Sequence, residues 1–346
     1  MSEVHDPQDR VLRARPDDPE GQALRAMPLL RVEALRTWFP VRAGLLRRPT
    51  AWIRAVDGVD LRVEAGRTLA LVGESGCGKT TLGRSILRLV EPSGGRVLFE
   101  GTDLLALAPA ALHPVRRRLQ IVFQDPMASL DPRLRVRDAI AEGMQAFGIG
   151  AGEAERSDRV AALLRRVRLD PIYMERFPHE LSGGQRQRVC IARALAVEPR
   201  LLVCDESVSA LDVSIQAQIL NLLRDLQDEL GLAYLFITHD LGVVRYLAHR
   251  VAVMYLGQIV EEGPTARVFE DPRHPYTRAL LAAMPSVDPS RRSVAVRAHG
   301  EVPSPLHPPS GCRFRTRCPE AFARCRAEAP ALVVRDDGAS RCFLSE

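Results

Sequence analysis

The sequence lacks any apolar run that approaches the length of a membrane-spanning helix. Its first residues, Met-Ser-Glu-Val-His-Asp-Pro, also lack the basic and then apolar pattern of a secretory signal. From these two absences we expect a protein that lies in the cytosol or on the cytosolic face of a membrane.

Neither sign of charge dominates. The 346 residues include 48 Lys and Arg and 43 Asp and Glu, which gives a net charge of +5, and the two signs are interspersed. This pattern indicates a solvated mixed surface rather than a dedicated basic groove for nucleic acid. Hydrophobic residues make up 46% of the chain, which is enough to form the core of one large domain or two.

One stretch carries a specific chemical pattern. Leu69–Val72 is an apolar run typical of a buried parallel strand, and Gly73 to Thr80 match the phosphate-loop pattern G-x-x-x-x-G-K-[ST]. Three glycines in six positions let the backbone turn its N–H groups inward around anionic oxygens, and the helix predicted over 79–89 would direct its dipole at them. We expect Lys79 to reach the β- and γ-phosphates of a nucleotide, and Thr80 to bind Mg²⁺.

Strand-like runs alternate with helical patterns over most of the chain, which predicts an α/β fold with a mostly parallel sheet and helices on both faces. The stretch from about 126 to 185 has a helical pattern and is predicted to be an inserted subdomain. The first strand is expected at Leu29–Leu35, ending near Pro40, where the proline stops the pairing, and a basic loop is expected over 41–53.

Polar residues follow three other buried runs. Asp205 and Glu206 end an apolar strand, so we expect Asp205 to contact Mg²⁺ and Glu206 to act as the general base for an attacking water. Gln124 and His239 each follow a further strand and would lie at the same sheet edge. Gln124 is expected to touch Mg²⁺ or the water, and His239 the γ-phosphate.

Together these motifs resemble the nucleotide-binding subunit of an ABC transporter. The matching pieces over residues 29–265 are the phosphate loop, Gln124, Leu181-Ser-Gly-Gly-Gln185, Asp205-Glu206, Ser209-Ala-Leu-Asp212 and His239. Three more pieces resemble the oligopeptide/dipeptide importer branch: Asp131-Pro132, Val213-Ser-Ile-Gln-Ala-Gln218 and His274-Pro275-Tyr276-Thr277. The resemblance implies a P-loop NTPase (RecA-like) core with an ABC β-subdomain and an inserted α-helical subdomain.

The resemblance also implies the following site residues. ATP would be bound by Phe39, Gly73, Glu74, Ser75, Gly76, Cys77, Gly78, Lys79, Thr80 and Thr81. Mg²⁺ would be held by Thr80, Gln124 and Asp205. The ATP of the opposite subunit in a head-to-tail dimer would be bound by Ser182, Gly183, Gly184, Gln185 and Asp212.

Phe39, with Trp38 as the alternative, would stack on adenine, although an ordinary core aromatic residue fits the sequence nearly as well. Ser207 stands where the family usually has proline after the Walker B glutamate, a departure that restores a backbone N–H and loosens the turn.

The implied function is an ATPase that powers import of dipeptides or oligopeptides. Its partners would be two permease subunits, a second ABC ATPase that is identical or homologous, and an extracytoplasmic solute-binding protein reached through the permeases. The protein would be peripheral on the cytoplasmic face of the inner membrane. Nickel or glutathione import remains an alternative, as do a soluble ATP-dependent switch and a non-transport ATPase acting on nucleic acid. The sequence shows no long heptad run of the kind that nucleic-acid ATPases carry, so no nucleic-acid partner is expected.

The chain is expected to divide into three parts. Residues 1–28 would form a flexible N-terminal tail, 29–265 the nucleotide-binding domain, and 266–346 a C-terminal extension. Within this extension, 302–310 would be a semi-rigid, proline-rich linker.

Four of the seven cysteines lie close together in the extension: Cys312, Cys318, Cys325 and Cys342. Four thiolates are the ligand set of a [4Fe–4S] cluster, and nearby arginines would offset its negative charge. The spacing lacks the tight pairs of common zinc ribbons, so Zn²⁺ is the alternative, followed by no metal. Disulfides fit a cytosolic location poorly.

Cys77 lies inside the phosphate loop, near Lys79 and a helix N-terminus. Both features favour a thiolate, so we expect a reactive cysteine whose labelling inactivates the enzyme. The alternative is a small buried residue that reagents do not reach.

Overall fold

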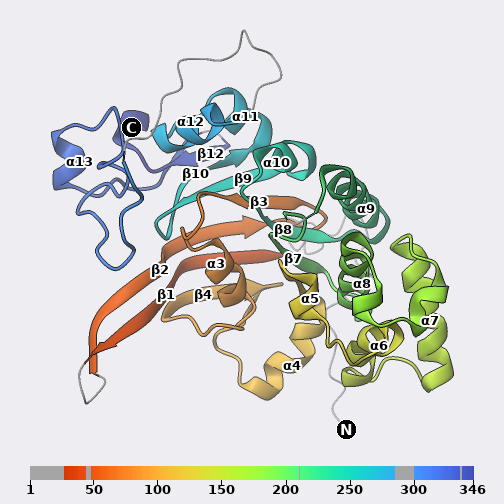
Figure 1. Cartoon of the computed structure of the whole chain (residues 1–346). Helices are drawn as coiled ribbons and strands as arrows, with labels where there is room; N and C mark the ends of the chain where they lie inside the picture. Colours follow the sequence, from red (N-terminus) through yellow and green to blue (C-terminus); the bar gives the residue numbers. More distant parts are fainter. Residues whose placement is uncertain (1–26, 44–47, 210, 285–299, 336) are drawn as a thin grey trace, which may run out of the picture.

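The computed structural model describes residues 27–43, 48–209, 211–284, 300–335 and 337–346 (Figure 1). The flexible tail predicted for residues 1–28 lies outside the described residues except for its last two.

A large sheet forms the centre of the molecule. Its strands are β3 (Thr68–Val72), β6 (Leu119–Val122), β7 (Leu201–Asp205), β8 (Ala233–Ile237), β9 (Arg250–Tyr255), β10 (Gln258–Pro264), β11 (Val333–Arg335) and β12 (Gly338–Ser340). They are ordered β11-β12-β10-β9-β3-β8-β7-β6. The five strands from β9 to β6 are parallel, and β10, β12 and β11 add antiparallel pairs at one end. The predicted mostly parallel sheet is confirmed.

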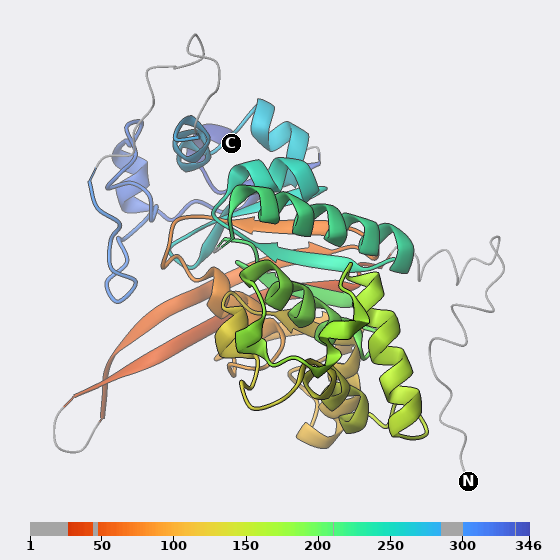
Figure 2. The same cartoon turned by 45° about the vertical axis from the view of Figure 1, so that its right-hand side comes forward.

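Helices cover both faces of this sheet (Figures 1 and 2). They are α3 (Lys79–Ile86), α4 (Pro109–Arg118), α5 (Pro126–Ser129), α6 (Val136–Ala146), α7 (Glu153–Arg166), α8 (Gly183–Leu195), α9 (Val213–Leu230), α10 (Leu241–Leu247), α11 (Thr265–Glu270), α12 (Pro275–Ala282) and α13 (Ala323–Ala327). The 3₁₀ turns are η1 (Pro171–Glu175), η2 (Pro178–Glu180) and η4 (Phe343–Ser345). The helices predicted within 136–167 and from 183 onward are confirmed, whereas α4 and α10 to α12 were not predicted.

Alternate residues of each central strand face different cores. On β7, Leu201 and Val203 pack with α3 and a second sheet, whereas Leu202 and Cys204 pack with α8 and α9. All five β7 residues are buried, which is why its first four residues are apolar rather than alternating.

The second sheet is antiparallel, with the order β2-β1-β4-β5, where β1 spans Leu30–Ala43, β2 Arg48–Val63, β4 Gly94–Phe99 and β5 Thr102–Asp103. The prediction that β1 stops near Pro40 is wrong, because Pro40 pairs with Trp52 and the hairpin continues to Ala43 and Arg48. The predicted loop over 41–53 is therefore mostly strand. Beyond Arg36, β1 no longer pairs with β4, so one edge of its backbone is open and tolerates a proline. This hairpin projects from the body (Figure 2).

The C-terminal residues are built onto the central sheet. In β12, Ala339 and Ser340 pair with Glu262 and Glu261 of β10. Phe314 belongs to the cysteine-rich stretch, which runs from Cys312 to Cys342. Its ring packs with Tyr255 of β9 and Tyr276 of α12, with ring centroids 5.3 and 5.4 Å away.

Glu261 connects the sheet to the segment that follows it. Its side chain is fully buried, accepts hydrogen bonds of 2.9 Å from the backbone N–H groups of Arg273 and His274, and pairs with Arg267 at 3.3 Å. These contacts fix the start of α12. His274 caps this helix by accepting from the N–H of Tyr276, and burial lowers the pKa of its imidazole to about 3, so it stays neutral.

Glu261→Gln should lower the free energy of unfolding by about 2 kcal/mol, because an amide nitrogen would face a backbone donor and the charge on Arg267 would lose its partner. Urea denaturation measures this loss. The matched control is Glu262→Gln on the opposite face of β10. Glu262 also pairs with an arginine, Arg250, at 3.3 Å, but among the described residues no backbone N–H donates to its side chain, and burial raises its pKa, so this substitution should cost less. Equal effects of the two substitutions would contradict the role given to Glu261.

Candidate nucleotide-binding site

The phosphate loop joins β3 to α3 and is held by backbone contacts from three sides. Gly73 and Gly78 have φ of +155° and +107°, conformations that favour glycine. A Cβ on Gly73 would lie 2.2 Å from the carbonyl oxygen of Met254, and one on Gly78 would lie 2.0 Å from that of Ala55. The N–H of Gly257 donates to the Cys77 carbonyl at 2.9 Å. The loop therefore has room for glycine alone at these two positions.

Lys79 lies against the loop that precedes it. Its side chain is buried, and Nζ donates to the carbonyl oxygens of Gly73 and Glu74 at 2.8 and 3.0 Å. The ammonium is thereby held beside the α3 N-terminus, where positive charge and free N–H groups suit an anion.

Thr80 and Asp205 meet at the end of β7. The Thr80 hydroxyl donates to Asp205 Oδ1 at 2.8 Å. Asp205 Oδ2 is buried and has no hydrogen-bond partner among the described residues, and its closest cation, Arg84, is 3.9 Å away. Burial raises the pKa of this carboxyl group above its usual range. A buried carboxylate oxygen without a partner beside a threonine hydroxyl fits the oxygen ligands that Mg²⁺ prefers.

Glu206, Gln124 and His239 also come together, as predicted. Gln124 Nε2 donates to Glu206 Oε2 at 2.8 Å, and His239 Nδ1 lies 3.6 Å from Glu206 Oε1. Glu206 has φ of +46°, an uncommon conformation for a residue with a side chain. The Glu206 N–H donates to the Ile237 carbonyl, and the backbone N–H and the hydroxyl of Ser209 both donate to the Glu206 carbonyl oxygen. These bonds hold the Glu206 backbone in place. The following residue, Ser207, is buried.

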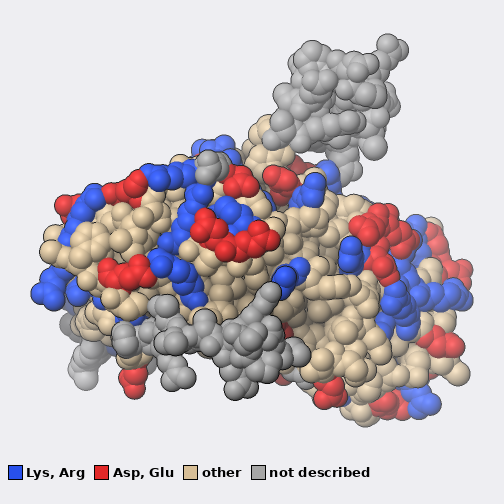
Figure 3. Space-filling view, turned by 90° about the horizontal axis from the view of Figure 1, so that it is seen from above, with Lys and Arg blue, Asp and Glu red and all other residues tan. Residues whose placement is uncertain are grey.

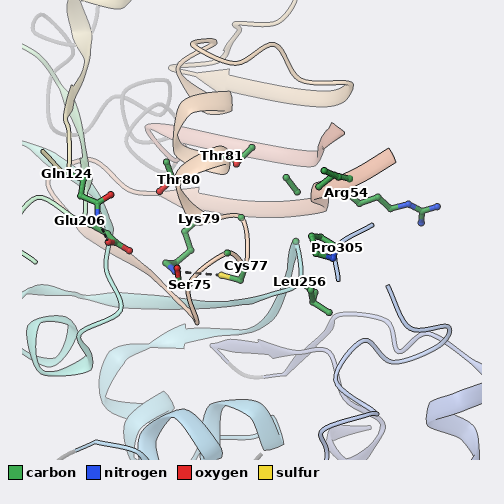
Figure 4. A pocket seen from close by; sticks show the side chains of 15 residues that line it. Arg54, Ser75, Cys77, Lys79, Thr80, Thr81, Gln124, Glu206, Leu256 and Pro305 are labelled. Carbon is green, nitrogen blue, oxygen red and sulfur yellow. Dashed lines mark hydrogen bonds between the residues drawn. The ribbon is translucent and has the colours of Figure 1, made fainter. Parts of the chain in front are cut away.

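A cavity of ≈ 260 Å³ brings the phosphate loop together with Gln124 and Glu206, whereas Asp205 and His239 do not belong to its lining (Figure 4). It is lined by Ile53, Arg54, Ala55, Gln124, Glu206, Leu256, Gly257, Pro305 and the loop residues from Ser75 to Thr81. Arg54, Leu256 and Pro305 were not predicted, because they come from the hairpin, the β9–β10 turn and the C-terminal region. The predicted linker over 302–310 thus contributes to this cavity, and Arg54 N–H donates to the Pro305 carbonyl at 3.2 Å.

Phe39 is not brought to the cavity. It lies on β1 opposite Ile53, is 39% exposed, and does not belong to the cavity lining. Trp38, the alternative, donates from its indole nitrogen to Asp57 and stacks with Arg54. Ile53, which pairs with Phe39 on the facing strand, lines the cavity instead.

The residues predicted to bind the ATP of the opposite subunit lie outside this cavity. Ser182 caps α8: its hydroxyl accepts from the Gln185 N–H at 3.3 Å, and Gln185 Oε1 accepts from the Ser182 N–H at 2.9 Å. A Cβ on Gly184 would lie 2.6 Å from Ile215 of α9, so the glycine lets these two helices pack closely. None of these four residues lines the cavity of its own chain, and neither does Asp212, which directly precedes α9. The four are Ser182, Gly183, Gly184 and Gln185.

The expectation of a reactive thiolate at Cys77 is wrong. The side chain is 3% exposed, and burial raises the pKa of its thiol despite the nearby ammonium of Lys79. Burial disfavours the charged form more strongly than one adjacent cation favours it.

The four C-terminal cysteines converge on one place. Cys312, Cys318, Cys325 and Cys342 line the same cavity of ≈ 10 Å³, and all four are free thiols. The Cys312 N–H donates to the Cys325 carbonyl at 2.9 Å. Burial raises the pKa of Cys318 to about 11. Within the described ranges, no three His, Cys, Asp or Glu side chains already have the arrangement of a metal site.

The surface seen in Figure 3 carries Lys and Arg groups beside Asp and Glu groups, without a large area of one sign. This agrees with the mixed surface expected from composition. In the part of the chain that the structure describes, no helix is long and apolar enough to cross a membrane.

Comparisons with known proteins agree with this geometry. Residues 56–209 match the family model described as ABC transporter, and residues 260–325 match the model described as oligopeptide/dipeptide transporter, C-terminal region. The chain is 54% identical over 310 residues to a probable peptide ABC transporter ATP-binding protein of Sinorhizobium fredii, which covers 90% of this chain and 88% of the relative.

Two further relatives are informative. The glutathione import ATP-binding protein GsiA of Escherichia coli is 55% identical over 281 residues, which is 81% of this chain and 45% of GsiA. Among solved structures, the ATP-binding cassette MJ0796 in a dimeric post-hydrolysis state with ADP and Pi is 28% identical, with a TM-score of 0.60 over 68% of this chain and 98% of that one.

Cys77 in the folded protein should react with a maleimide only slowly at neutral pH, because burial shields its thiol and raises its pKa, which disfavours the reactive thiolate. Peptide mapping of the labelled protein measures this, and the same site in urea is the control. Rapid labelling of Cys77 in the folded state, slowed by MgATP, would instead support an exposed thiolate.

Proposed function

The chain belongs to the ATP-binding proteins of ABC transporters, within the oligopeptide/dipeptide importer group, and we propose that its cavity is where it hydrolyses ATP to power uptake of dipeptides or oligopeptides. The observation that carries the proposal is that one cavity brings the phosphate loop together with Gln124 and Glu206. ATP hydrolysis needs phosphates held at one side and a water activated at the other.

Each side chain then has a distinct task. Lys79 and the loop N–H groups would hold the β- and γ-phosphates, and Thr80, Asp205 and Gln124 would hold Mg²⁺. When bound, Mg²⁺ supplies positive charge that offsets the charge developing on the phosphates. Glu206 accepts a proton from the attacking water, and Gln124, which is hydrogen-bonded to Glu206, orients this carboxylate. His239, 3.6 Å from Glu206, contacts the γ-phosphate.

The second half of each site comes from another subunit. Ser182, Gly183, Gly184, Gln185 and Asp212 would bind the ATP of the opposite subunit in a head-to-tail dimer. Their absence from the lining of their own cavity supports this assignment. The N-terminus of α8 provides backbone N–H groups suited to an anion.

The partners follow from the family. We propose that the protein lies at the cytoplasmic face of the inner membrane, bound to two permease subunits and to an identical or homologous second ATPase. An extracytoplasmic solute-binding protein would deliver the cargo, and no nucleic acid is involved. Glutathione import is the second candidate, because GsiA is 55% identical over 281 residues. Uptake of labelled peptides and of glutathione can be compared between cells with and without the gene. The compound whose uptake falls when the gene is missing is the cargo.

Glu206→Gln should retain ATP binding, stabilise the ATP-bound dimer and lower turnover by at least about 100-fold, since an amide does not accept the proton of water. Steady-state hydrolysis and size-exclusion chromatography with MgATP measure these effects. Glu198→Gln is the matched control, because Glu198 is exposed and pairs with Arg117. Turnover near the wild-type value in Glu206→Gln would refute the general-base role.

A second proposal concerns residues 266–346, which we treat as the importer's C-terminal extension. We propose that Cys312, Cys318, Cys325 and Cys342 hold a [4Fe–4S] cluster with a structural role, with Zn²⁺ as the alternative metal. The shared cavity supports the proposal, because it gathers the four thiols that such a cluster needs. They do not already surround one point closely enough for a single ion, which would need sulfurs at about 2.3 Å from it.

Anaerobically purified protein should be brown and contain about four iron atoms and four sulfides per chain. Cys312→Ser should lose both the colour and the iron, whereas Cys190→Ser, at a buried cysteine of α8, should keep them. Zinc in place of iron would favour the alternative metal, and protein without any bound metal would exclude both.

A further inference from the structure

The phosphate loop contains one acidic residue, Glu74, directly after its first glycine. A carboxylate within an anion-binding loop opposes the charge of a triphosphate. Burial raises the pKa of the Cys77 thiol in the same loop, and the charge of Glu74 acts in the same direction. The loop therefore needs a means of offsetting this charge.

The offset comes from the cysteine-rich stretch, 243 residues further along the chain. Arg317 donates from its two terminal nitrogens to the two oxygens of Glu74, at 2.8 and 3.1 Å. The Arg317 side chain is 9% exposed and that of Glu74 is 29% exposed, so the pair is only partly screened by water. A two-point fork of this kind also fixes the direction of the carboxylate.

A second contact fixes the backbone of the same residue. The N–H of Glu74 donates to the hydroxyl of Tyr276 at 2.9 Å. Tyr276 is 1% exposed and packs against Tyr255 and Phe314. It also stands in the first turn of α12, where His274 accepts its N–H, so its ring has little freedom to move.

We propose that Arg317 and Tyr276 are positioning residues of the ATP site. Arg317 neutralises Glu74 so that the loop accepts a triphosphate. Tyr276 fixes the backbone conformation of Glu74, the residue directly before Ser75. The inference rests on the proposed ATPase function and adds that the C-terminal region completes the phosphate loop. Neither residue touches the nucleotide; both act through Glu74.

If the ion pair had only a structural role, its loss would affect ATP affinity differently. If the pair served only to attach the C-terminal region, losing either partner would weaken the fold, and ATP binding would fall to the same extent for both. If Arg317 neutralises Glu74, the two losses have opposite effects on ATP affinity. Removing the arginine leaves a negative charge near the phosphates, whereas removing the carboxylate leaves a positive one.

The test measures the Kd for a fluorescent ATP analogue and the steady-state KM and kcat of the full-length protein. Arg317→Ala should raise the Kd and the KM for ATP by about fivefold at low salt, with kcat largely retained and a smaller effect at high salt. Glu74→Gln should bind ATP about twofold more tightly. Adding Glu74→Gln to Arg317→Ala should restore most of the lost affinity. Tyr276→Phe should raise the KM because the N–H of Glu74 loses its acceptor.

The matched control is Arg315→Ala, since Arg315 lies in the same stretch but its side chain donates to Ser310 instead of to the phosphate loop. It should leave the KM for ATP unchanged. Wild-type protein that binds no ATP would refute the proposed function itself. Wild-type protein that binds ATP, with Arg317→Ala unchanged or with a loss that Glu74→Gln does not restore, would refute the positioning role alone. Should Arg317→Ala fail to fold, Glu74→Gln decides, because weaker ATP binding in that variant overturns the proposal.

Discussion

The structure depends on keeping one loop turned so that its N–H groups converge on an anion. Gly73 and Gly78 make the turn, and their lack of a Cβ lets the carbonyls of Met254 and Ala55 press against the loop. Hydrogen bonds then run from Gly257 to Cys77 and from Asp57 to Gly257. Arg313 of the cysteine-rich stretch in turn binds Asp57. The loop is thereby held by β2, by the β9–β10 turn and, through Asp57, by the C-terminal region.

The charged groups around this loop are costly to keep in place. Burial raises the pKa of Asp205, and one of its oxygens has no hydrogen-bond partner among the described residues. Glu206 occupies an unfavourable backbone conformation. Asp205 is the last residue of β7 and Glu206 follows it, and the residues of this strand are fully buried between two hydrophobic cores. A rigid strand between two packed faces allows a poorly solvated carboxylate and a strained backbone to persist at its end.

The C-terminal region is part of the same construction. Its strand β12 extends the central sheet, Glu261 holds the start of α12, and Phe314 packs with Tyr255 and Tyr276. Because these contacts lead directly to Glu74, a change in the cysteine-rich stretch would be transmitted to the phosphate loop over a short, packed path. Phe314 and Arg317 make this connection. In the sequence they lie between Cys312 and Cys318, two of the four cysteines that line one cavity.

The sequence by itself determined the phosphate loop, the acids after β7 and the strand–helix alternation, because each rests on local spacing and on runs of apolar residues. It also predicted that Gln124, Glu206 and His239 meet, since the ends of parallel strands share one edge. Only the tertiary structure decided that Phe39 lies outside the cavity, that burial raises the pKa of Cys77, and that Arg317 and Tyr276 bind Glu74. These outcomes depend on burial and on contacts between residues up to 243 positions apart, which no local pattern encodes.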